Sequence, residues 1–89
     1  MQYEWDENKR IANLEHHKVD FTEAVEFEWD SAIETIDDRY DYGETRWVTI
    51  GFINKKLHVM VYTIRRNKIR IISLRKANRR ESSYYEENQ

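Results

Sequence analysis

The second half of the chain alternates apolar and polar residues with the period of a β-strand. This pattern predicts three strands, at Trp47–Ile53, Leu57–Ile64 and Lys68–Leu74. The linkers between them, Asn54-Lys55-Lys56 and Arg65-Arg66-Asn67, suit hairpin turns because asparagine tolerates positive φ. These strands carry apolar residues on both faces, so we expect other elements to cover both sides of the sheet.

Helical spacing predicts two helices in the first half of the chain. The first spans about Glu7–His16, with Asp6 as its N-cap. The second runs from Asp20 to about Glu28, where Asp20 and Glu23 are spaced as a capping box. A short strand or an extended entry at Gln2–Trp5 is predicted to precede both helices.

The remaining segments complete the predicted fold. Residues 30–46 are acidic and weakly patterned, which predicts a long connection with a short strand near Ile33–Ile36. Lys76–Glu87 lacks Gly and Pro and has helical spacing, so it predicts a C-terminal helix. We therefore expect one α+β domain over residues 1–89, with two N-terminal helices, an antiparallel sheet of three to four strands and a C-terminal helix.

Composition excludes several classes of function. The chain has no cysteine, which rules out disulfides and thiolate zinc sites, and its three histidines lack the spacing of a metal site. Its two glycines cannot form a phosphate-binding loop. Its apolar runs are too short to span a membrane, and no signal-peptide pattern is present. We expect a cytoplasmic protein that uses no metal or other cofactor.

The charges divide the chain into two unlike halves. Residues 1–46 contain 5 Lys or Arg against 14 Asp or Glu, whereas residues 47–89 contain 10 against 3. Such asymmetry predicts that the basic half contacts a polyanion. The alternative is that acidic helices only complement a basic sheet within one fold.

The junction between the last predicted strand and helix contains the densest group of cations. Five of them fall within eleven residues: Arg70, Arg75, Lys76, Arg79 and Arg80. Arginine suits phosphate because its planar fork matches two phosphate oxygens. RNA can be cut without a metal ion, because the 2′-hydroxyl beside each phosphate serves as the nucleophile. The cluster therefore predicts an RNA-phosphate site, although a solvated helix face has the same composition.

Candidate roles follow from that chemistry. Arg70, Arg75 and Arg79 are candidates to stabilise the scissile phosphate, and a helix start would place Arg75 and Arg79 on one side of it. Glu81, His17 or Lys9 could act as the proton acceptor. Lys76, Arg80 and Tyr84 are candidate RNA contacts, with Tyr84 stacking on a base or assisting as an acid.

Lys9, Asn13 and His17 are spaced by four residues and form a polar stripe on the first predicted helix. Asparagine is a poor residue for a helix interior unless its side chain has a partner. Two interpretations of Asn13 remain open: a hydrogen bond to the backbone of a neighbouring loop, or a role near the RNA site.

Several motifs together resemble one known family. They are Trp5-Asp6-Glu7-x-Lys9-Arg10-x-Ala12-Asn13-Leu14 with His17 and Val19-Asp20-Phe21, then Asp41-Tyr42-Gly43-Glu44-x-Arg46 before Ile50-Gly51, then Val61-Tyr62-Thr63, and Ile69-Arg70-Ile71-Ile72-Ser73-x-Arg75-Lys76-Ala77-x-Arg79-Arg80-Glu81 with Tyr84. In this order and spacing the chain resembles BrnT-type toxins over nearly its whole length.

That resemblance implies a compact, RelE-like ribonuclease toxin of a type II toxin–antitoxin pair, which inhibits translation and growth. It also implies a cognate BrnA-type antitoxin, whose ribbon-helix-helix part binds operator DNA, so the toxin would meet DNA only indirectly. From the charge split, we expect the antitoxin to bind the acidic first half and the exposed sheet surface.

The chain departs from the family pattern at two places. His16-His17-Lys18 stands where the family has Lys-His-Gly, and glycine is suited to a left-handed helix end, so either Lys18 carries a small strain or the turn differs. Ser82-Ser83 occupies a stretch that is more basic in relatives.

The sequence therefore favours a metal-independent endoribonuclease toxin. Two non-catalytic alternatives remain: an adaptor that uses its arginines to bind an acidic or disordered protein, and a DNA-binding module.

Overall fold

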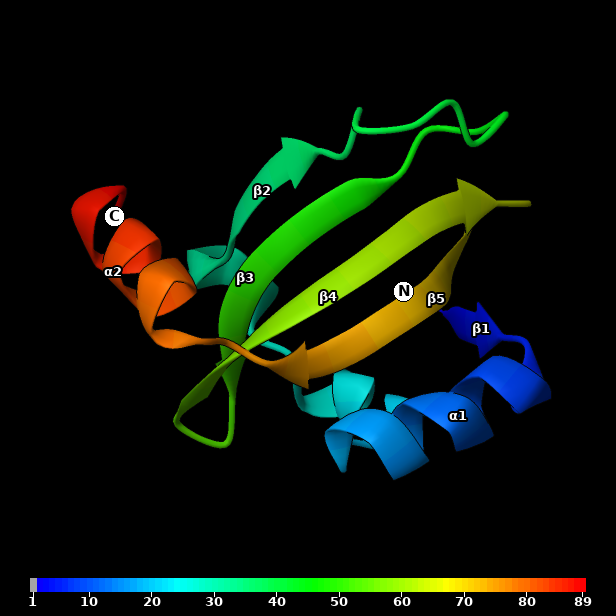
Figure 1. Ribbon diagram of the computed structural model, residues 1–89, viewed down its shortest axis with the longest axis horizontal. Coiled ribbons are helices and arrows are strands. Elements are labelled where there is room, and N and C mark those ends of the chain that lie inside the picture. The colour runs from blue at the N-terminus through cyan, green and yellow to red at the C-terminus, as the bar shows by residue number, and fades with distance from the viewer. Residues whose placement is uncertain (1) are drawn as a thin grey trace.

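The computed structural model describes residues 2–89 as one sheet with helices on its two faces (Figure 1). Within these residues the sheet has five strands in the order β1-β5-β4-β3-β2. The elements are β1 (Tyr3–Trp5), α1 (Glu7–His17), the 3₁₀ helices η1 (Phe21–Glu26) and η2 (Trp29–Ser31), β2 (Ile33–Ile36), β3 (Trp47–Ile53), β4 (Lys56–Arg65), β5 (Lys68–Lys76) and α2 (Arg79–Glu87).

The α+β class is confirmed, but the expected antiparallel sheet of three to four strands is wrong. β1 pairs in parallel with β5, with Tyr3 opposite Ile69 and Trp5 opposite Ile71, so the sheet is mixed. The three pairs β2–β3, β3–β4 and β4–β5 are antiparallel. A strand of three residues carries no local signal for its neighbour or its direction, because tertiary packing decides both.

The prediction of two N-terminal α-helices is also wrong, since only α1 is an α-helix. The segment after it, η1, is a 3₁₀ helix. Phe21, Ala24 and Phe27 are all buried, and their spacing of three matches the three residues per turn of a 3₁₀ helix. The predicted capping box is confirmed: the Asp20 side chain accepts from Thr22 N at 3.0 Å, and Glu23 accepts from Asp20 N at 3.0 Å.

The C-terminal helix begins later than predicted. β5 continues to Lys76, and α2 starts at Arg79 after the N-cap Asn78. Asn78 and Glu81 form a capping box, in which Glu81 N donates to Asn78 Oδ1 and Asn78 N donates to Glu81 Oε1, both at 2.8 Å. This pair satisfies backbone groups at the helix start, so the chain remains extended until it reaches Asn78.

Both predicted hairpin turns are confirmed. Asn54 and Lys55 have φ values of 48° and 70°, and Arg66 and Asn67 have values of 54° and 64°. Two consecutive residues with positive φ are typical of the tight turns whose twist matches that of the flanking strands.

The two faces of the sheet are covered unequally. One face packs against η1 and contains the larger core, which includes Phe21, Met60 and Leu74. On the other face α2 buries Tyr85 against Ile50 and Val59, and the Tyr85 hydroxyl donates to Ser31 O at 2.8 Å. In Figure 1, α2 lies over one end of this second face and leaves the rest in view.

None of the helices in residues 2–89 has the length and apolar content that crossing a membrane requires. The RelE-like classification implied by the family resemblance stays a prediction.

Lys18 ends α1 in the left-handed conformation, which is the strained one of the two alternatives left open by the sequence. Its φ is 62° and its ψ is 25°, and its backbone N–H donates to Leu14 O at 2.9 Å. A side chain with a Cβ is strained in this region, by about 1–2 kcal/mol per residue. The next residue, Val19, is already buried in the core.

We predict that Lys18→Gly stabilises the protein by about 0.5–1 kcal/mol, because relief of strain exceeds the extra freedom that glycine gives the unfolded chain. Urea denaturation measures the free energy of unfolding. Lys18→Ala is the matched control, since it removes the same side chain but keeps the strained Cβ, and it should not stabilise. A glycine variant no more stable than the alanine variant would contradict this account.

Candidate functional site

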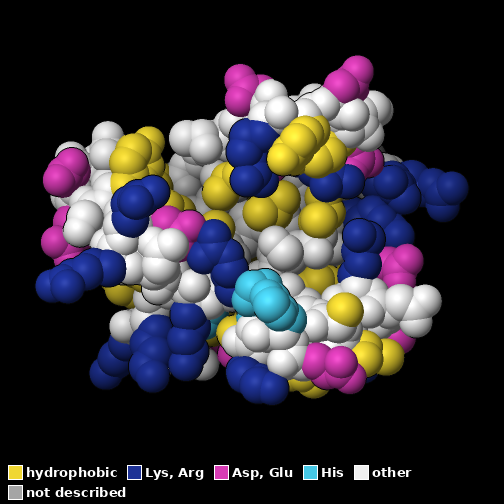
Figure 2. Space-filling view, viewed as in Figure 1, with side chains coloured by type: hydrophobic (Ala, Val, Ile, Leu, Met, Phe, Trp, Pro, Cys, Tyr) yellow, Lys and Arg dark blue, Asp and Glu magenta, His cyan; other side chains and the backbone are white. Residues whose placement is uncertain are grey.

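The uncovered half of the second sheet face forms a shallow surface that we call the open face. Its floor is a row of half-buried residues in register across three strands, Val48, Val61 and Ser73. Figure 2 shows this side of the molecule, with hydrophobic side chains in a hollow, Lys and Arg around it and histidine at its lower edge. The surface thus combines an apolar floor with a cationic border.

A β-bulge in β5 places two arginines on the open face. Arg75 lies opposite Val59 and Arg70 lies opposite Thr63, so the two arginines are five residues apart while their partners on β4 are four apart. Ile72 is the extra residue, since Ile71 pairs with Tyr62 and Ser73 with Val61. Residues five apart in a regular strand point to opposite faces, so the bulge is what brings Arg70 and Arg75 to one side.

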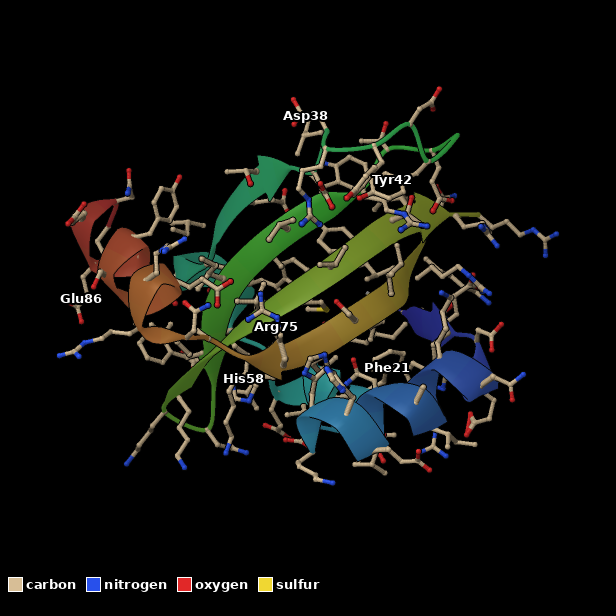
Figure 3. The ribbon with its side chains drawn as sticks, viewed as in Figure 1. Phe21, Asp38, Tyr42, His58, Arg75 and Glu86 are labelled. Carbon is tan, nitrogen blue, oxygen red and sulfur yellow. The ribbon has the colours of Figure 1, made fainter. Side chains whose placement is uncertain are left out.

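Arg75 is held by Glu81 from α2. The guanidinium donates two hydrogen bonds to the carboxylate, Nη1 to Oε1 at 2.8 Å and Nη2 to Oε2 at 2.6 Å. The side chain of Arg75 is 33% exposed, and in Figure 3 it lies over the sheet. This is the bidentate geometry by which arginine binds carboxylates and phosphates alike. The fork of Arg75 is therefore oriented in advance, with a carboxylate in the position of an anion.

Glu81 is a poor proton acceptor in this arrangement. The hydrogen bonds from Arg75 lower the pKa of Glu81 below its usual range, and the bond from Asn78 N lowers it further. The pKa of Arg75 is shifted in the complementary direction, because its hydrogen bonds to Glu81 raise it. Glu81 therefore stays ionised and orients Arg75.

His17 is the titratable side chain best suited to accept a proton near Arg75. It lies half-buried in the last turn of α1. Burial lowers the pKa of His17 below its ordinary value near 6.5, and the charges of His16 and Arg75 lower it further. A histidine with this shift is neutral at pH 7 and has a free ring nitrogen. Lys9 lines the same cavity of about 300 Å³ as His17.

Asn13 joins α1 to β5 and thereby sets the position of His17. Its Nδ2 donates to Leu74 O at 2.7 Å and to Val19 O at 2.9 Å, and its Oδ1 accepts from Leu74 N at 3.2 Å. The side chain extends the hydrogen-bond ladder of β5 beyond the residues that pair with β1. Of the two interpretations left open by the sequence, the bond to a neighbouring backbone is the one observed.

The other candidate residues are dispersed around this centre. Arg70 is ion-paired with Glu4 of β1 at 3.0 Å, at the opposite end of the open face from α2. Arg79 and Arg80 are exposed at the start of α2, and Tyr84, 45% exposed, lies one turn further along. The expectation that Arg75 and Arg79 share a helix is wrong, because Arg75 belongs to β5.

Lys76 is separated from the open face. It follows Arg75 directly in β5 and pairs with His58, and successive residues of a strand point to opposite faces. The sheet therefore directs Lys76 away from Arg75.

Sequence reasoning from periodicity missed Arg46 and Tyr42. Arg46 precedes β3, and its guanidinium carbon lies 4.0 Å from the centre of the Tyr42 ring. Extending the alternation of β3 backwards by two residues from Val48 would have placed Arg46 on the open face. The acidic, weakly patterned connection that includes Arg46 obscured this signal.

Across residues 2–89, no three histidine or carboxylate side chains gather in a way that could hold a metal ion.

Comparison with known families agrees with this chemistry. The family model for the ribonuclease toxin BrnT of type II toxin–antitoxin systems matches residues 5–81, from β1 to the first turn of α2. The match includes Arg70, Arg75 and Glu81 but ends before Tyr84. No curated protein sequence matches the chain. The family match spans most of the 89 residues, and the chain belongs to the BrnT family of ribonuclease toxins.

Proposed function

We propose that this protein is a metal-independent endoribonuclease that cuts RNA by attack of a 2′-hydroxyl on the adjacent phosphate. The observation that carries the proposal is the oriented guanidinium of Arg75 on the open face, whose charge acts on the half-buried imidazole of His17 in the last turn of α1. Membership of a ribonuclease toxin family supports it independently.

In the proposed reaction, the 2′-oxygen forms a bond to phosphorus and the bond to the 5′-oxygen breaks. The products are a 2′,3′-cyclic phosphate and a free 5′-hydroxyl. His17 accepts the proton of the 2′-hydroxyl, and Arg75 neutralises the charge that develops on the phosphate oxygens. Lys9, which lines the same cavity as His17, is the candidate to return a proton to the leaving 5′-oxygen.

The remaining cations guide the RNA chain in this proposal. Arg70 and Arg79 lie at the two ends of the strand–helix segment that carries Arg75, and they would hold neighbouring phosphates. Arg80 and Tyr84, both exposed on α2, would contact RNA beyond the scissile position. Lys76 points away from the open face, so its contribution is limited to long-range attraction.

Glu81 acts on Arg75 in two opposing ways. Its carboxylate orients the guanidinium, but it also occupies the hydrogen bonds that a phosphate would accept. A bound phosphate must therefore share or displace Glu81. The N-cap residue Asn78 keeps Glu81 close even then, because Asn78 N also donates to Glu81 Oε1.

The biological setting follows from the family. A type II toxin has a cognate antitoxin, and we propose a BrnA-type ribbon-helix-helix protein for this role, with operator DNA bound only through the antitoxin. In the cytoplasm, the free toxin would cleave RNA, inhibit translation and arrest growth.

We predict that Arg75→Ala abolishes growth arrest and lowers RNA cleavage by about 100-fold or more, the usual cost of losing a charged group that stabilises a transition state. Growth after induction, and cleavage by purified protein, measure the two effects. The matched control is Arg66→Ala, which removes an exposed arginine from the β4–β5 turn and should leave both unchanged. A folded Arg75→Ala protein that remains fully toxic would refute the assigned site and favour a non-catalytic binding function.

The lowered pKa of His17 predicts a pH dependence. A base works only when it is unprotonated, so cleavage should be constant around pH 7 and should fall as the pH drops through a value below 6.5. His17→Asn should remove this acidic decline and lower the rate by about 100-fold or more. A pH–rate profile of the purified enzyme provides the measurement.

His16→Asn is the control for this experiment, because His16 is exposed and in ring contact with His17. His16→Asn should keep the acidic decline of the cleavage rate. The decline should move slightly upward in pH, because the charge of His16, which lowers the pKa of His17, is lost. An unchanged profile in His17→Asn would show that another group is the base.

A further inference from the structure

The connection between β2 and β3, residues 37–46, places a tyrosine at the border of the open face. We call this connection the rim loop. The ring of Tyr42 lies under the guanidinium of Arg46, at 4.0 Å, and Arg46 shares a face with Val48 by the alternation of β3. In Figure 3, Tyr42 lies beside the sheet at the end distant from α2. Tyr42 therefore belongs to the same surface as Arg75.

A buried carboxylate gives the rim loop a defined shape. The side chain of Asp37 is only 2% exposed. It accepts from Arg39 Nε at 2.9 Å, from Arg39 Nη2 at 3.0 Å and from the Tyr42 hydroxyl at 3.1 Å. The hydrogen bonds from Arg39 lower the pKa of Asp37 to about 2, so the carboxylate remains charged. Arg39 and Tyr42 are thus both hydrogen-bonded to one buried carboxylate.

Tyr40 is the residue that the fold itself does not explain. Its side chain is 70% exposed, and its ring meets Tyr42 edge to face with centroids 5.8 Å apart. The guanidinium carbon of Arg39 lies 6.0 Å from the centre of the Tyr40 ring. Figure 2 shows hydrophobic side chains at the upper border of the hollow with Lys and Arg beside them. Tyr40 offers solvent an aromatic ring, held between a second ring and a cation.

The chemistry that fits this arrangement is a nucleobase. An unpaired base stacks on a tyrosine ring and on the plane of an arginine, and such stacking tolerates any base. Phosphate fits less well here, because the loop also carries Asp38 and Asp41. Figure 3 shows Asp38 pointing away from the sheet, so it does not oppose a base that lies on the open-face side.

The sheet register relates this position to the scissile phosphate. Arg75 lies opposite Val59, and Val59 lies opposite Ile50, so Arg75 is level with Ile50. Arg46, just before Trp47, is four residues from Ile50 along the strand direction. Arg46 and Arg75 are therefore separated by four residues along the strand direction, about 13 Å, and by the two strand spacings from β3 to β5, about 10 Å. A short single strand can bridge that distance, and Arg70, which lies level with Arg46 but on β5, offers a further phosphate contact.

We propose that Tyr40, together with Arg39, forms a nucleobase-stacking subsite that holds a base of the RNA at a fixed distance from the phosphate bound by Arg75. This inference rests on the proposed ribonuclease function. Tyr42 is the positioning residue of the subsite, since its ring packs against the edge of Tyr40 and its hydroxyl is bound to Asp37.

The test uses fluorescein-labelled hexanucleotides of 2′-O-methyl RNA, which lack the attacking hydroxyl and therefore bind without being cut. Tyr40→Ala should weaken binding by about fivefold to a hundredfold, the usual contribution of one stacked base. Tyr40→Phe should bind like the unmodified protein, because it keeps the ring. The matched control is Ile36→Ala, which removes an exposed apolar side chain just before the rim loop and should not change binding.

A second measurement moves a single abasic nucleotide along the hexanucleotide. With the unmodified protein, one abasic position should weaken binding by a similar factor, and with Tyr40→Ala that position should have no further effect. Equal affinity of the unmodified and Tyr40→Ala proteins for every hexanucleotide would overturn the subsite while leaving the proposed cleavage intact.

Two other outcomes would also overturn the inference, for reasons that can be told apart. If Tyr40→Ala leaves RNA binding unchanged but weakens binding of the cognate antitoxin, the rim loop is a protein contact. If the unmodified protein neither binds the hexanucleotides nor cleaves unmodified RNA, the proposed function fails and the subsite fails with it.

Discussion

The bulge at Ile72 is the constraint on which the open face depends. A regular β5 would turn either Arg70 or Arg75 towards the buried core, where an unpaired guanidinium would be very costly. With the extra residue, the apolar side chains of Ile71 and Leu74 both face the core while the two arginines face solvent. The same residue, Ile72, lines the cavity shared with His17 and Lys9. One inserted residue thus reconciles a continuous core with a cationic surface.

The ion pair between Arg75 and Glu81 connects this surface to α2. Glu81 takes part in three hydrogen bonds that orient it: two from Arg75, and one from Asn78 N at the helix start. A bidentate pair that is partly shielded from water is stronger than an exposed one, because water screens it less. The same contact orients Arg75 and limits its access to other anions. In the proposed ribonuclease, the affinity for RNA therefore depends on how readily a phosphate replaces the Glu81 carboxylate.

Local signals in the sequence predicted the parts of the fold that local chemistry determines. The asparagines in both hairpin turns and the capping box of Asp20 and Glu23 specify their own backbone geometry, and each was identified correctly. For Lys18, comparison with a family glycine left two alternatives, and the strained left-handed conformation is the one observed. Parallel pairing of β1 with β5 could not be predicted, since it joins residues more than sixty positions apart. The bulge was also missed, because an extra residue is apparent only against a partner strand.

The candidate site was predicted by residue type rather than by arrangement. The arginine cluster predicted a site at the strand–helix segment, but its helical interpretation placed Arg75 and Arg79 on one element and Lys76 beside them. The structure instead brings His17 towards Arg75 through the hydrogen bonds of Asn13 to β5. The rim loop contributes Arg46 and Tyr42 to the same face. These relations depend on side-chain contacts between distant elements, which periodicity cannot report.

The measurement that tests the central claim most directly is incubation of the purified, antitoxin-free protein with RNA in excess EDTA, followed by analysis of the new RNA ends. The account predicts cleavage that yields 2′,3′-cyclic phosphate and 5′-hydroxyl ends. Absence of cleavage by folded protein, or fragments with 5′-phosphate ends, would contradict it, because a 5′-phosphate requires attack by water rather than by the 2′-hydroxyl.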